Sequence, residues 1–192
     1  MTLYKNKYRN TSIRWEKWDY RNPGAYFVTI CTKNRISYFG ECVDDKMHLN
    51  NVGEIIDKYW KEIPQHFPNV ILDEFVVMPN HLHGIIIINA RLDDEMKPVD
   101  TLHCNISTID SNEKNEFMSK ISPKPGSLST ILRSFKSICT KEINKQFPEM
   151  IFGWQSRFHD RVIRDKMEFE RIKQYIMNNP QNWKSDKLFE NK

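Results

Sequence analysis

Two histidines, His81 and His83, flank Leu82 in the part of the chain most typical of metal chemistry. They follow a Pro-Asn turn signal and precede four consecutive isoleucines at residues 85–88, a run typical of a buried β-strand. Successive side chains of a strand point to opposite faces, so both imidazoles would share one face and Leu82 would lie on the other. Two adjacent imidazoles can hold one metal ion. Exposed or hydrogen-bonded histidines at the start of a strand also fit this short pattern.

A tyrosine and an asparagine near the C-terminus could supply the chemistry that the histidines lack. Tyr175 and Asn179 are four residues apart in a helical segment that ends at Pro180, so both would point from one helical face. A tyrosine hydroxyl can act as a nucleophile, and an amide oxygen can complete a metal site. In the structural alternative, Tyr175 packs one turn beyond Ile172 and Asn179 only ends the helix.

The composition limits the classes of protein to consider. The chain has 192 residues, a formal net charge of +4 and a pI near 8.8, which favours a polyanionic partner. Its four cysteines lie far apart without a Cys-x-x-Cys pair, so we expect a reducing compartment rather than a disulfide framework or a zinc knuckle. No signal-peptide pattern is present, and no apolar run approaches the ~20 residues of a membrane span. We therefore expect a cytoplasmic protein that does not enter a membrane.

Basic side chains gather in three places. The first is an arm at residues 1–24, where cations alternate with aromatic rings. This composition suits a nucleic-acid backbone with unstacked bases, although aromatics tucked against the domain would also explain it. The other two are a helix after Ser127 and a strand near residue 160, where a solvated basic face is the usual alternative. The candidate nucleic-acid contacts are Arg9, Arg14, Arg133, Lys136, Arg157, Arg161 and Arg164.

Residues 25–183 predict one α+β domain with the element order β-α-β-β-α-β and a further C-terminal helix. The strands are expected at 26–32, 70–77, 81–88 and 158–164. Capping residues and helical spacing predict helices that begin at Asn51, Ser127 and Asp165, and Pro64 is expected to stop the first.

This order is that of the ferredoxin-like split βαβ fold, a four-stranded antiparallel sheet. We expect two helices to cover one face of the sheet and to leave the other available, with the histidines on a central strand. Residues 91–126 are polar and rich in turn formers, which predicts a long surface insertion, and residues 184–192 are expected to form a tail.

Five motifs occur together in the order of a known protein family. They are Tyr-Phe-Val-Thr-Ile-Cys-Thr, Met-Pro-Asn-His-Leu-His-Gly, Ser-Leu-Ser…Phe-Lys-Ser, Trp-Gln…Asp-Arg-Val-Ile-Arg and Tyr-Ile-x-x-Asn-Pro-x-x-Trp. Together they resemble the REP-associated tyrosine transposases, a branch of the HUH single-strand transposases. The resemblance extends from Tyr26 to Trp183, and the segment 91–126 is its least matched part.

The resemblance implies a metal-dependent endonuclease and strand transferase that cleaves and rejoins single-stranded DNA through a 5′-phosphotyrosine, at hairpin-forming repeats. His81 and His83 match the metal-binding pair of the family, Tyr175 matches its nucleophile, and Asn179 matches its third metal ligand. The family implies Mg²⁺ or Mn²⁺, whereas imidazoles alone would suggest zinc. The implied partner is single-stranded or hairpin DNA, which would bring the protein to the nucleoid. Both a monomer and a homodimer are compatible with the sequence.

Two other functions fit the same residues. The first is a non-catalytic single-stranded nucleic-acid-binding module, since the ferredoxin-like fold also supports RNA-binding domains. The second is a small metal-dependent hydrolase that uses His81, His83 and Asn179 with a bound water. Only the transposase reading predicts a covalent protein–DNA adduct, so such an adduct separates the three.

Overall fold

A four-stranded antiparallel sheet forms the centre of the computed structural model, which describes residues 3–4, 8–9, 19–20, 22–90 and 126–189. Its strands are β3 (Gly24–Cys31), β6 (Val70–Met78), β7 (His81–Ile88) and β8 (His159–Ile163). Their order across the sheet is β6-β7-β3-β8, which is the ferredoxin-like arrangement. The predicted α+β fold is confirmed, and β7, which carries both histidines, is a central strand.

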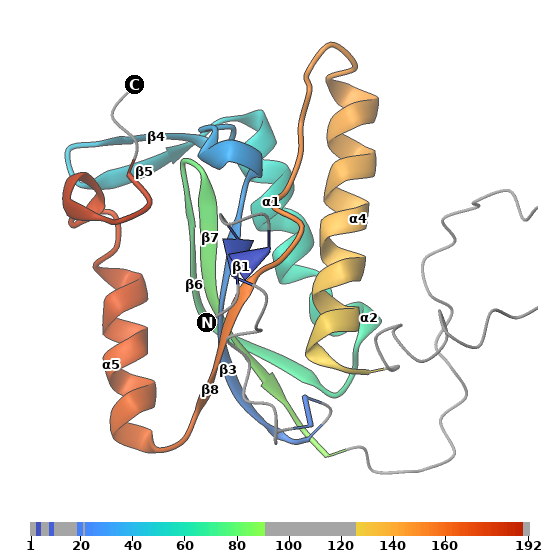
Figure 1. Ribbon diagram of the computed structural model, residues 1–192, viewed down its shortest axis with the longest axis vertical. Coiled ribbons are helices and arrows are strands. Elements are labelled where there is room, and N and C mark those ends of the chain that lie inside the picture. The colour runs from blue at the N-terminus through green and yellow to red at the C-terminus, as the bar shows by residue number, and fades with distance from the viewer. Residues whose placement is uncertain (1–2, 5–7, 10–18, 21, 91–125, 190–192) are drawn as a thin grey trace, which may run out of the picture.

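Helices cover both faces of this sheet (Figure 1). The helices α1 (Asn51–Lys61) and α4 (Leu128–Gln146) lie on one side, and α5 (Lys166–Met177) lies on the other. The main core joins the sheet to α1 and α4, and a smaller cluster packs Ile85 against Ile172 and Ile176 of α5. The expectation of an uncovered second face was therefore wrong, because α5 buries its own apolar stripe there.

Capping residues set where the helices begin. The side chain of Asn50 accepts hydrogen bonds from two backbone N–H groups, so α1 is capped one residue earlier than predicted. Pro64 does not stop α1 but lies in the first turn of the short α2 (Ile63–His66), where its missing N–H is harmless. Ser127 and Asp165 cap α4 and α5 as expected. Local hydrogen bonding thus explains both the confirmed boundaries and the shifted one.

The structure contains a small β-hairpin that the sequence did not predict. It pairs β4 (Gly40–Val43) with β5 (Lys46–Leu49) through Asp44 and Asp45, whose φ angles are 49° and 60°. Two left-handed residues in a two-residue loop form the type of turn that matches the twist of a hairpin, and aspartate tolerates that conformation.

The remaining regular elements are short. They are β1 (Leu3–Tyr4), β2 (Tyr8–Arg9), η1 (Lys33–Arg35) and η2 (Trp183–Ser185). Of the expected insertion at 91–126, only Gly126 belongs to the described residues, and most of the expected arm at 1–24 also lies outside them. Within the described ranges, no helix has the length and apolar character needed to cross a membrane.

Candidate active site

The hairpin of β6 and β7 fixes both histidines on one face of the sheet. His81 pairs with Met78 across the two-residue turn and with Cys31 of β3, and both imidazoles are buried, with ring centroids 4.5 Å apart. Leu82 points into the main core on the opposite face, so the predicted alternation is confirmed. A Cβ on Gly84 would come within 2.4 Å of Trp60, so this glycine lets α1 pack closely on β7.

Hydrogen bonds orient both imidazole rings. The Nδ1 of His81 lies 2.8 Å from Oδ1 of Asn80, while the amide nitrogen of Asn80 donates to the carbonyl oxygens of Arg35 and Leu188. Because the amide oxygen can only accept, Nδ1 of His81 carries the proton and Nε2 keeps its lone pair. The Nδ1 of His83 lies 2.8 Å from the hydroxyl of Thr29. Partners of this kind hold metal-binding histidines in position in other proteins.

The helix α5 brings Tyr175 and Asn179 to the same place. The Tyr175 hydroxyl lies 3.3 Å from Nε2 of His83, and its ring meets Phe27 edge-on. Tyr175 is 45% exposed, so it is not a core residue, whereas Asn179 is 1% exposed. Within the part of the chain that the structure describes, neither Oδ1 of Asn179 nor Nε2 of His81 has a hydrogen-bond partner. Burying a polar atom without a partner lowers the folding stability by about 1–3 kcal/mol unless a ligand binds that atom. Such atoms are therefore typical of a ligand site.

Sequence reasoning missed Asp186, which follows η2 and reaches the same site. Its Oδ2 accepts hydrogen bonds from the Tyr175 hydroxyl and from Nδ2 of Asn179, both at 3.4 Å. Ligand atoms of His81, His83 and Asp186 all lie within 4.8 Å of one another, so two imidazoles and one carboxylate could bind the same ion. Residues 184–189, expected to be part of a tail, therefore lie against the domain. The available signal was Trp183, a large aromatic residue just beyond the last helix.

Burial determines the protonation of the site. Burial lowers the pKa of His81 to about 3 and that of His83 well below its ordinary value, so both rings are neutral and able to bind a metal ion at neutral pH. Burial, and then the charge of Asp186, raise the pKa of Tyr175. The phenol is consequently protonated at neutral pH and needs a nearby cation to become a good nucleophile.

The two neutral imidazoles make the metal-free fold sensitive to acid. In the unfolded chain a histidine titrates near pH 6.5, whereas folded His81 titrates near pH 3, so the unfolded state binds more protons between these values. The free energy of unfolding should fall by about 1.4 kcal/mol per pH unit for each such histidine as the pH drops through this window. We expect the Tm in EDTA to decrease below pH 6.5, and less steeply in a His81→Gln/His83→Gln variant. Equal slopes for the two proteins would contradict this assignment.

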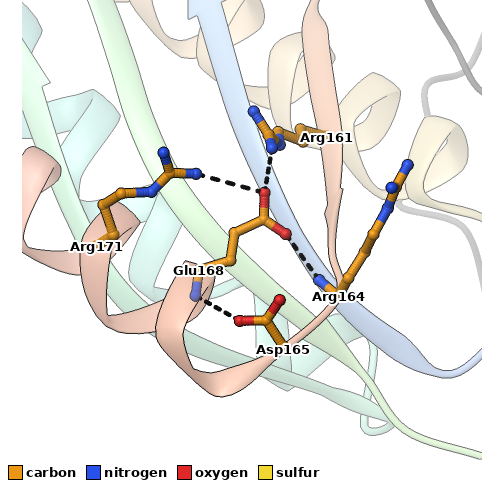
Figure 2. Close-up of polar contacts among 5 residues, drawn as sticks. All are labelled: Arg161, Arg164, Asp165, Glu168 and Arg171. Carbon is orange, nitrogen blue, oxygen red and sulfur yellow. Dashed lines mark hydrogen bonds and ion pairs between the residues drawn. The ribbon is translucent and has the colours of Figure 1, made fainter.

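An ion-pair network joins the start of α5 to β8 (Figure 2). Glu168 pairs with Arg161 of β8 and, at 3.7 Å, with Arg171, and its Oε2 accepts a hydrogen bond from the backbone nitrogen of Arg164. The Asp165 side chain accepts from the backbone nitrogen of Glu168 at 2.8 Å and so caps α5, while Glu168 reaches back to Arg164 rather than to the backbone nitrogen of Asp165. Arg161 thus holds α5 in place, and its side chain remains 62% exposed. Its predicted contact with DNA stays a prediction.

The other predicted DNA contacts lie in different surroundings. Arg133 and Arg157 are exposed. Lys136 turns inward, where its Nζ donates to the carbonyl oxygen of Gln155 at 2.5 Å. The side chain of Arg9 in β2, and the whole of Arg14, lie outside the described residues. Contacts between these side chains and DNA remain predictions.

The fold is that of a REP-associated tyrosine transposase. A solved structure described as that transposase bound to a REP hairpin matches with a TM-score of 0.55 and 16% identity, over 89% of this chain and 74% of the other. No known protein-family profile matches the chain.

An uncharacterized protein of Haemophilus influenzae is 36% identical over 181 residues, which cover 93% of this chain and 92% of the relative. The chain therefore belongs to the same family as the Haemophilus protein. The structural likeness defines the fold of this chain, and the sequence identity to the Haemophilus protein across almost the full length defines the family.

Proposed function

We propose that the protein is a transposase that cleaves and rejoins single-stranded DNA through a 5′-phosphotyrosine. The observation that carries this proposal is a partly exposed tyrosine hydroxyl that lies 3.3 Å from His83. Beside it lie Nε2 of His81 and Oδ1 of Asn179, two buried atoms without a hydrogen-bond partner among the described residues. A tyrosine with only a packing role would not be nearly half exposed beside two neutral imidazoles. The fold shared with a hairpin-bound REP-associated transposase supports the same reaction class.

The residues present fit a divalent metal ion. His81 and His83 would hold the ion through their Nε2 atoms, with oxygen donors from Asn179 and Asp186. Two imidazoles alone favour zinc, but added amide and carboxylate oxygens make the set suitable for Mn²⁺, which accepts both nitrogen and oxygen ligands. When bound, such an ion withdraws charge from the scissile phosphate and orients it for attack. We propose Mn²⁺ or Mg²⁺ as the cofactor, and Mn²⁺ is the first ion to test.

Tyr175 would perform the covalent step. Its hydroxyl oxygen forms a bond to phosphorus while the bond from phosphorus to the 3′ oxygen breaks, which leaves a 5′-phosphotyrosine and a free 3′-OH. The phenol loses one proton and the departing oxygen gains one, so the reaction conserves protons. One phosphodiester replaces another, and rejoining by the reverse reaction needs no ATP. The ring is held against Phe27 and His83, which keeps the hydroxyl at the site.

The substrate we propose is DNA that contains a hairpin beside a single-stranded segment. The solved relative in fold is described as bound to a REP hairpin, and the present chain carries a net charge of +4 and exposed arginines near β8. One chain carries the proposed nucleophile and all four proposed ligands, which supports cleavage within a single copy.

The test is incubation with a hairpin oligonucleotide labelled at its 3′ end, with Mn²⁺ or with EDTA, followed by a denaturing gel. We expect a slowly migrating protein–DNA band only with Mn²⁺, because the label stays attached to Tyr175. Cleavage without such a band would favour the metal-dependent hydrolase, and metal-independent binding without cleavage would favour the non-catalytic module. Either of these outcomes would overturn the proposal.

A further inference from the structure

A concave surface lies beside α4, on the other side of the sheet from α5. It has a volume of about 590 Å³ and is formed by α4 and residues 154–158. Three cations line it, Arg133, Lys136 and Lys141, together with four hydroxyl side chains and the rings of Trp154 and Phe158. We call this surface the α4 groove.

The α4 groove is suited to an anion. No carboxylate lines it, and among the described residues none pairs with Arg133 or Lys141, which are both exposed. These two cations stand eight residues apart on α4, with Ser137 midway between them, so they follow one stripe along the helix. The stripe lies away from the apolar residues that α4 buries, such as Phe135 and Cys139. Cations and hydroxyls of this kind are the side chains that contact the phosphates of nucleic acids.

The far wall of the α4 groove is rigid. Trp154 donates from Nε1 to the carbonyl oxygen of Lys136 at 3.2 Å, and Lys136 donates back to the carbonyl oxygen of Gln155. The backbone nitrogen of Gln155 donates to Cys31 of β3, so this segment is fixed to the sheet. A wall held in this way loses little conformational entropy when a ligand binds.

We infer that the α4 groove is a second binding site for single-stranded DNA, where phosphates contact Arg133 and Lys141 and a base packs against the aromatic wall. The inference rests on the proposed function, from which the DNA substrate is taken. A volume of 590 Å³ lies within the range of about 300–1,000 Å³ typical of small-ligand pockets, which accommodates one or two nucleotides but not a duplex. Aromatic rings beside cations are the usual means of holding unpaired bases.

The position of the α4 groove relative to Tyr175 supports this inference. The helix α4, which lines the groove, and the helix α5, which carries Tyr175, lie on opposite faces of the sheet (Figure 1). The strand β8, which begins directly after Phe158, is the edge of the sheet between them. A single strand that passes over this edge could occupy the groove and the catalytic site together, and would be held on both sides of the scissile phosphate.

The inference is tested by fluorescence anisotropy in EDTA, so that neither metal nor cleavage affects the result. The probes are a labelled hairpin with a single-stranded extension and the same hairpin without it. The variant Arg133→Gln/Lys141→Gln should bind the extended hairpin about tenfold more weakly, and its plot of log K against log salt should be less steep by about 1.4, for two lost contacts to a single strand. Binding of the blunt hairpin should change less than about twofold, since no extension reaches the groove.

The matched control is Lys46→Gln/Lys58→Gln, which removes the same charge from exposed positions of β5 and α1. It should bind both probes within about twofold of the wild type, because neither lysine lines the α4 groove. An equal loss in this control, or an unchanged salt slope in the groove variant, would overturn the inference. Far-UV spectra check that all variants fold.

The gel assay with Mn²⁺ separates this inference from the proposed function. If the wild-type protein forms no adduct but the groove variant still loses affinity selectively for the extended hairpin, DNA binding by the groove is supported and the proposed reaction is contradicted. If the adduct forms and the groove variant binds like the wild type, the proposed reaction is supported and DNA binding by the groove is contradicted. An extension made of RNA tests the choice of DNA, and tighter binding of RNA than of DNA would contradict it.

Discussion

Replacing Tyr175 with phenylalanine is expected to abolish the covalent protein–DNA adduct while leaving the fold intact. The substitution removes one hydroxyl and keeps the ring, so its contacts with Phe27 and His83 survive. The lost hydrogen bonds are long, at 3.3 Å to His83 and 3.4 Å to Asp186, so Tm should change little. The measurement is the denaturing gel with Mn²⁺, in which the shifted band should fall below detection.

Tyr59→Phe is the matched control, because Tyr59 lies on α1 and packs against the main core, away from α5. It should keep the full adduct. DNA binding by Tyr175→Phe in EDTA should also remain at the wild-type level, since phosphate contacts rather than the nucleophile supply affinity. An undiminished adduct in Tyr175→Phe would show that another residue attacks the phosphate. Loss of folding in that variant would instead show that Tyr175 is a packing residue.

The order of elements could be predicted from the sequence because each strand and helix repeats its own period. The run of isoleucines after His83 and the apolar pattern of α4 each extend over enough residues to identify a strand and a helix. The hairpin of β4 and β5 was missed because each strand has only four residues and its turn is Asp44-Asp45 rather than a glycine-containing pair. Short elements offer too few repeats for a period to stand out.

The site was only partly predictable for a different reason. His81 and His83 are neighbours in one motif, and Tyr175 and Asn179 lie one helical turn apart, so local spacing reveals each pair. Thr29, Asn80 and Asp186 join the site only through strand pairing, the β6–β7 turn and the path of the chain after Trp183. Such contacts depend on tertiary structure, which the spacing of residues along one helix or strand does not reveal. Nε2 of His81, which has no hydrogen-bond partner among the described residues, likewise becomes recognisable only in the folded structure.

Replacing His81 or His83 with alanine is expected to abolish metal-dependent cleavage and to leave most of the DNA affinity. Each imidazole is a proposed ligand whose Nε2 faces the site, so its loss removes one strong donor to the ion. Binding of Mn²⁺ can be measured without DNA by the Tm increase that it causes, since a ligand of the folded state stabilises it by RT ln(1 + [L]/Kd). This increase should disappear in both variants, and anisotropy in EDTA should still detect DNA binding.

The oxygen donors should behave differently from the imidazoles, and this difference identifies the ligand set. Asn179→Ala and Asp186→Asn should still cleave DNA but need more Mn²⁺, because two histidines can hold the ion loosely while each variant weakens one oxygen donor. His48→Ala is the control, since His48 is an exposed histidine of β5 outside the site, and it should match the wild type in Mn²⁺ response and cleavage. Cleavage at the wild-type rate by a His81→Ala/His83→Ala variant would show that the ion binds elsewhere. A full Mn²⁺ response in Asp186→Asn, together with a weakened one in Asn179→Ala, would assign the third ligand to Asn179 alone.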